Sequence, residues 1–122
     1  MTNIPYITDL LGVKYVLHGR NKKGFDCYGL AIEVSKRFGH TLHDFWYDYI
    51  KSTTDTFIKN ANYGLELNDI LKKTNIFEAG NIIIFFENKK MVHIGVLLKK
   101  DDFIHCDNLG VRISKVSDYF RK

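Results

Sequence analysis

The 122-residue chain has few of the features that divide, anchor or cross-link a protein. It contains one proline and no stretch rich in Pro, Gly or Ser, so we expect no linker and a single domain over residues 1–122. No apolar run is long enough to span a bilayer, and no basic segment followed by an apolar one opens the chain. We therefore expect no signal peptide, synthesis in the cytoplasm and no membrane partner.

Cysteine is also scarce, and the common metal-binding spacings are missing. Two cysteines, Cys27 and Cys106, could form one disulfide at most. Secreted disulfide scaffolds of this size usually carry more, so we expect free thiols in a reducing compartment. No Cys-x-x-Cys or His-Glu-x-x-His run occurs, and we expect neither a metal site nor a cofactor.

The net charge of +4 comes from scattered lysine pairs rather than from one basic block. Such pairs are typical of solvated turns and helix ends. A mild attraction to anionic polymers would suit nucleic acid or an anionic cell wall, and charge alone does not choose between them. The sequence gives no indication of the oligomeric state.

The sequence predicts a helix over Cys27–Phe38. Asp26 is a natural N-cap, because its carboxylate can accept hydrogen bonds from the unpaired amides of the first turn. Apolar residues at every fourth position, including Leu30 and Val34, give the helix one apolar face. Gly39 can take the left-handed conformation that ends a helix.

The rest of the chain predicts helices first and an antiparallel sheet last, which is the α+β class. The last third is rich in β-branched and aromatic residues separated by short polar turns, as in a meander of strands. The predicted helices are Ile4–Leu11, Ser52–Tyr63 and Asn68–Lys73, with an extended piece over Val13–Leu17 and a polar loop over His18–Gly24. The predicted strands are Asn81–Phe86, Met91–Leu98, Phe103–Cys106 and Val111–Val116.

Cys27 is the strongest candidate for chemistry. A thiol attacks a carbonyl as the thiolate, and a helix N-terminus favours that charge, so we expect a lowered pKa for Cys27. The first-turn amides could also serve as an oxyanion hole. The alternative is that Cys27 is a small buried apolar residue.

Two histidines on successive strands are candidates for the base and its partner. Strand alternation places His93 and Gly95 on one face, and a turn near Lys100 brings His105 within cross-strand reach of His93. Gly95 would leave room for a substrate or for the helix. Each histidine could instead be an ordinary core, edge or surface residue of its strand.

The other cysteine and histidines have weaker claims. Cys106 should point away from the face that carries His105, so we interpret it as structural. His18, His40 and His43 fall in loops, and only His18 is near enough to Cys27 in sequence to line a groove.

With these residues in place, the chain resembles the NlpC/P60 family of cysteine peptidases. Four motifs carry the resemblance in the family's order: Gly24-Phe25-Asp26-Cys27-Tyr28-Gly29-Leu30, Gly80-Asn81-Ile82-Ile83-Ile84-Phe85, His93-Ile94-Gly95-Val96 and Ile104-His105. Two positions depart from the family pattern. His18 replaces the first Gly of a usual Gly-Gly pair, and Asn81 replaces a usual Asp.

The resemblance implies a papain-like fold and cleavage of bacterial cell-wall stem peptides, usually between D-γ-glutamate and a diamino acid. Cys27 would be the nucleophile, His93 the base and His105 the residue that orients it. The implied partner is peptidoglycan, with no nucleic acid. We predict substrate contacts for the residues around the nucleophile, namely Tyr15, His18, Asp26 and Tyr28.

An aromatic residue directly after the nucleophile, as in Tyr28, resembles the bacteriophage tail branch of the family. That branch implies tail proteins as partners and a location on the virion. Two alternatives stay open at this stage. One is a thiol amidase or acyltransferase on the same scaffold, and the other is a tail-assembly module without activity.

Overall fold

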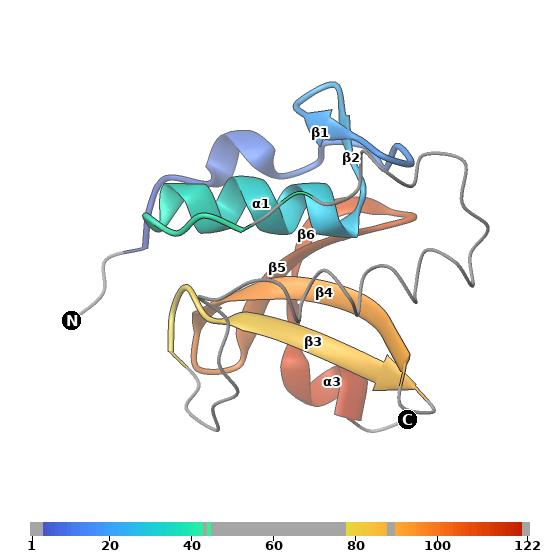
Figure 1. The fold of residues 1–122 in the computed structure, drawn as a ribbon. Helices are drawn as coiled ribbons and strands as arrows, with labels where there is room; N and C mark the ends of the chain where they lie inside the picture. The colour runs from blue at the N-terminus through green and yellow to red at the C-terminus, as the bar shows by residue number, and fades with distance from the viewer. Residues whose placement is uncertain (1–3, 43, 45–77, 88–89, 121–122) are drawn as a thin grey trace.

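The computed structural model describes residues 4–42, 44, 78–87 and 90–120 (Figure 1). The helices predicted over 52–63 and 68–73, and His43, lie outside the described residues. The elements in chain order are η1 (Thr8–Leu10), β1 (Arg20–Asn21), β2 (Gly24–Phe25), α1 (Cys27–Arg37), β3 (Ile82–Glu87), β4 (Lys90–Lys99), β5 (Asp102–Asp107), β6 (Gly110–Lys115) and α3 (Val116–Phe120).

The last third forms the predicted meander. Strands β3, β4, β5 and β6 are antiparallel neighbours in that order. Both ends of each of the four strands lie within one residue of the predicted bounds. The turn η1 and the helix α1 precede the sheet, which is antiparallel, so the predicted α+β class is confirmed. Within the described part of the chain, no helix is long and apolar enough to cross a membrane.

The sheet has two different faces because strand residues alternate in direction. One face packs against α1 through Ile94, Val96 and Ile104, which meet Leu30 and Val34 of the helix. The other face packs against the start of α3 through Leu97, Phe103 and Val116, with Ile83 and Phe85 at its side. Figure 1 shows α1 and α3 on opposite sides of the sheet.

Helix α1 begins at the predicted residue and ends at Arg37, one residue before the predicted end at Phe38, which is the C-cap. Asp26 is the N-cap, and its carboxylate accepts a 2.7 Å hydrogen bond from the amide of Gly29. Gly39 follows the helix with φ +89°, the left-handed conformation that glycine adopts without strain. The helix therefore fixes the position of Cys27 as its first residue.

Two N-terminal predictions are wrong in detail. The helix expected over Ile4–Leu11 is a single 3-10 turn, because a segment this short cannot nucleate an α-helix without stronger packing. The segment expected to be a loop over His18–Gly24 holds β1 and the first residue of β2, which pair as a hairpin. The side chain of Asn21 stabilises its turn by accepting a 2.9 Å hydrogen bond from the amide of Lys23.

Helix α3 is a finding that the sequence did not predict. Asp101, in the turn between β4 and β5, accepts hydrogen bonds from the amide and the hydroxyl of Ser117, at 2.9 and 2.6 Å. The first turn of α3 is therefore capped by a residue sixteen positions earlier in the chain. A cap of this kind leaves no local sequence signal.

Candidate active site

The loop before Cys27 is closed by glycines that are needed for space. A side chain on Gly29 would overlap the carbonyl oxygen of Gly19, and one on Gly19 would overlap the carbonyl oxygen of Gly24. A side chain on Gly24 would strike Val16. The glycines of the motif thus let the loop lie directly against the first turn of α1 and hold the nucleophile's backbone in place.

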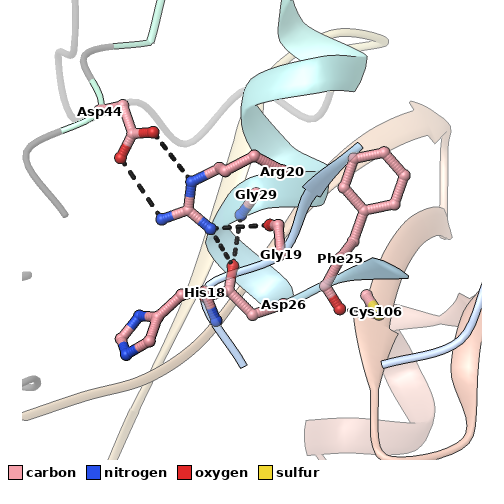
Figure 2. A network of polar contacts seen from close by, with 8 residues as sticks. All are labelled: His18, Gly19, Arg20, Phe25, Asp26, Gly29, Asp44 and Cys106. Atoms are coloured by element: carbon pink, nitrogen blue, oxygen red, sulfur yellow. Dashed lines mark hydrogen bonds and ion pairs between the residues drawn. The ribbon is translucent and has the colours of Figure 1, made fainter. Parts of the chain in front are cut away.

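Asp26 is the centre of a polar network beside the nucleophile (Figure 2). One carboxylate oxygen accepts from Gly29 and from Arg20 Nη1 at 2.8 Å, and the other accepts from the amide of His18 at 3.1 Å. Arg20 also donates to both carboxylate oxygens of Asp44, at 2.9 and 3.3 Å. Burial raises the pKa of Asp26, although Arg20 and the two amides lower it. The network ties β1, the helix cap and Asp44 together.

The Cys27 thiol is half-buried, and its environment opposes ionisation. Burial and, to a smaller extent, the charge of Asp26 raise the pKa of Cys27 to about 12, although the amides of Tyr28 and Ile94 act in the opposite direction. This is the reverse of the lowered pKa expected from the helix N-terminus. At neutral pH the substrate-free protein therefore holds a protonated thiol, which needs a base before it can attack.

The contact with Ile94 brings the thiol to the strand that carries His93. Leu97 exchanges hydrogen bonds with Asn81 and Gly80, so its backbone groups point toward β3. By alternation, the amide of Ile94 points toward β5. Strands β4 and β5 are paired from Val96 to Lys99 of β4, so Ile94 has no partner residue on β5. The amide of Ile94 is directed at the Cys27 thiol instead. Cys27 thus meets β4 one residue away from His93.

The structure brings His93 and His105 together as predicted. His93 Nε2 lies 2.7 Å from His105 Nδ1. His105 Nε2 lies 2.8 Å from the hydroxyl oxygen of Ser114 on β6. Burial lowers the pKa of His93, and burial together with the charge of His93 lowers the pKa of His105 to about 4. Both imidazoles are therefore neutral at pH 7, as a base that must accept a proton requires.

Aromatic rings hold the two imidazoles in this geometry. Phe85 stacks on His93 with ring centroids 5.8 Å apart, and Phe103 stacks on His105 at 4.3 Å. The two phenylalanines also contact each other at 5.4 Å, which closes a ring of four. A side chain on Gly95 would strike Phe103 and His105, so this glycine makes room for the cluster, and not for the substrate or helix that we expected.

The predicted substrate-binding residues lie around Cys27 with different exposures. Tyr15 is 40% exposed, its backbone forms a β-bridge with Phe25, and burial and the charges of Asp26 and Cys27 raise its pKa. His18 is partly buried and has φ +64°, a strained conformation for a residue other than glycine. Asp26 and Tyr28 are buried, at 2% and 1% exposed, and the Arg20 guanidinium lies over the Tyr28 ring. Substrate contact stays a prediction for all four residues.

Cys106 lies on the face of the sheet opposite His105, as predicted. It is fully buried, and its thiol donates a 3.2 Å hydrogen bond to the carbonyl of Phe25.

Sequence reasoning missed Arg20, Asp44 and Ser114, and none of them stands in a recognisable motif. Among the described residues, no three His, Cys, Asp or Glu side chains are grouped as a metal site would need.

Comparison with known proteins identifies the fold and the family of the chain. The chain is similar in structure to the crystal structure of the NlpC/p60 domain of the peptidoglycan hydrolase SagA, with a TM-score of 0.60 and 18% sequence identity over 88% of this chain and 81% of that one. At this identity the likeness shows the fold, and it confirms the expected papain-like arrangement. No curated protein sequence matches the chain. The sequence pattern of the NlpC/P60 family matches residues 12–122, and the chain belongs to that family.

Proposed function

We propose that the protein is a cysteine endopeptidase that hydrolyses peptidoglycan stem peptides. The observation that carries this proposal is the 2.7 Å contact between His93 and His105, on the strand whose next amide is directed at the Cys27 thiol. A nucleophile, a neutral base and a residue that orients the base are the parts that thiol acyl transfer needs. Family membership and the SagA likeness support a cell-wall substrate.

The proposed reaction begins with a neutral pair. His93 Nδ1 takes the thiol proton as Cys27 Sγ bonds to the scissile carbonyl carbon. His93 then gives this proton to the leaving amine as the C–N bond breaks, which leaves a thioester on Cys27. Water, deprotonated by His93, attacks the thioester, and the thiol recovers the proton. Peptide and water thus become an acid and an amine, and the enzyme is unchanged.

The tetrahedral intermediate needs donors for its oxyanion. In the first turn of α1, the Gly29 amide is bound to the Asp26 side chain and the Leu30 amide to the Asp26 carbonyl. The amides of Cys27 and Tyr28 are the remaining candidates at this helix N-terminus. Since the Tyr28 amide already faces the sulfur, it is well placed to contact an oxygen bound to the carbon that Cys27 attacks.

The proposal also specifies which peptide bond is cleaved and where the protein acts. The bond we propose is the one between D-γ-glutamate and the diamino acid, as the family resemblance implies. The setting we propose is a bacteriophage tail, supported by Tyr28 directly after the nucleophile. In that setting the protein would be made in the cytoplasm and act from the virion.

Mass spectrometry of muropeptides tests the activity and the bond. Purified peptidoglycan of the lysine and diaminopimelate types is incubated with the wild type, Cys27→Ser and Cys106→Ser. We expect new fragments that end at D-γ-glutamate with the wild type and with Cys106→Ser, and none with Cys27→Ser. Equal release by all three proteins, or no release by any, contradicts the proposal. Acyl exchange onto an added amine in place of hydrolysis would support the acyltransferase.

A further inference from the structure

Ser114 on β6 extends the chain of hydrogen bonds that starts at His93. Its hydroxyl oxygen is 2.8 Å from His105 Nε2, while His105 Nδ1 is 2.7 Å from His93 Nε2. The His105 side chain is fully buried, and Ser114 is half-buried on the strand beside it. Both ring nitrogens of the buried His105 are therefore hydrogen-bonded, Nδ1 with His93 and Nε2 with Ser114.

A neutral imidazole carries one N–H donor and one acceptor nitrogen. The two hydrogen bonds that link His93, His105 and Ser114 must therefore both be donated in the same direction, either from His93 toward Ser114 or from Ser114 toward His93. In one direction, His93 Nε2 donates to His105 Nδ1, and His105 Nε2 donates to Ser114. His93 Nδ1 is then an acceptor and can take a proton. In the other direction, Ser114 donates to His105, His105 donates to His93, and His93 Nδ1 carries a hydrogen. In that state His93 cannot act as a base through Nδ1.

We propose that Ser114 is a positioning residue, which supports the base-competent tautomer of His93 by accepting the N–H of His105. This inference rests on the proposed function, because it assumes that His93 accepts the thiol proton. When it does, both ring nitrogens of His93 become donors, and only the first direction is then available. Ser114 is the acceptor at the end of that chain, so it stabilises the protonated form of His93.

Removing the hydroxyl should reverse the tautomers. Without Ser114 as acceptor, the N–H at His105 Nε2 would lose this hydrogen bond inside the core, which is costly. The ring can avoid this by moving its hydrogen to Nδ1 and donating it to His93. Threonine and valine give a matched pair for the test, because they have the same shape, suit a β-strand, and differ by the hydroxyl that matters.

Nitrogen-15 NMR of histidine-labelled, substrate-free protein at pH 7.5 reads the tautomers directly. We expect the hydrogen of His105 on Nε2 in the wild type and in Ser114→Thr, and a shift toward Nδ1 in Ser114→Val. Backbone amide spectra of the variants establish that they are folded. A wild-type hydrogen on Nδ1, or an unchanged tautomer in folded Ser114→Val, overturns the proposal.

The kinetic arm separates positioning from general stability. We expect Ser114→Val to lower kcat for stem-peptide cleavage by about 10–100-fold with little change in KM, the range found when a residue that orients a metal-bound histidine is replaced. Ser114→Thr should recover most of this loss. Equal kcat in the two variants contradicts the role. If no stem peptide is cleaved, the NMR result still decides the tautomer, so the two proposals can fail separately.

Discussion

Acidification should unfold the protein in part through His105. Its ring is fully buried, stacked on Phe103 and bonded at both nitrogens, and its pKa is lowered to about 4. In the unfolded chain a histidine has a pKa of about 6.5. The unfolded state therefore binds more protons between these two values, so the free energy of unfolding rises with pH from about 4 to 6.5. A difference of 2.5 pKa units corresponds to about 3 kcal/mol.

The assay is urea unfolding of the wild type and His105→Gln at several pH values from 4 to 8. Glutamine can keep a donor and an acceptor in the site, but it does not titrate. The charges that face the ring come from His93, Asp107 and Arg112, and the first of these lowers the pKa of His105 further. We expect the stability difference between wild type and variant to change by about 3 kcal/mol between pH 7 and pH 4.

The exposed residue His40 provides the control for this series. His40→Gln should track the wild type across the whole range, since its side chain is not in the buried cluster. A difference between wild type and His105→Gln that stays constant with pH would refute the reasoning, because it would mean that the folded protein accommodates the charged ring. His93, whose pKa is also lowered by burial, should add to the wild-type slope in the same direction.

Three further predictions concern stability and are checked by urea unfolding. Gly29→Ala should lower the free energy of unfolding by at least about 2 kcal/mol, because its methyl group would overlap a backbone carbonyl. Gly39→Ala should lower it by about 1 kcal/mol, because the site has open space but a positive φ. Equal losses in the two variants would contradict this. Asp26→Ala should cost about 3 kcal/mol through the lost cap and its stranded donors, and a loss below 1 kcal/mol would be inconsistent with the network. Arg37 lowers the pKa of Asp9 to about 2, so stability from this pair should be complete above pH 4 and disappear toward pH 2, and Asp9→Asn should lack that loss.

The sequence predicts those parts of the fold whose signals are local. The cap at Asp26, the apolar face of α1 and the glycine after it all lie within one segment, and the structure has each in place. The approach of His93 to His105 was also predictable, because a short turn fixes which residues of two antiparallel strands face each other.

Other features depend on tertiary contacts that no local pattern records. Ser114 meets His105 only because β6 lies beside β5, and a serine in a strand is unremarkable by itself. The raised pKa of Cys27 shows the same limit. The helix N-terminus is visible in the sequence, but the burial that outweighs it comes from packing against β4 and the rest of the core.

The central claim is that His93 is the base for Cys27, and the pH dependence of Cys27 alkylation tests it most directly. The rate with iodoacetamide is measured in Cys106→Ser, with His93 present and with His93→Gln. The thiol is protonated and the pKa of His93 is lowered. The account therefore predicts that the alkylation rate rises with pH, with an inflection below pH 6.5 where His93 becomes neutral, and that this inflection disappears in His93→Gln. Superimposable profiles for the two proteins would contradict it.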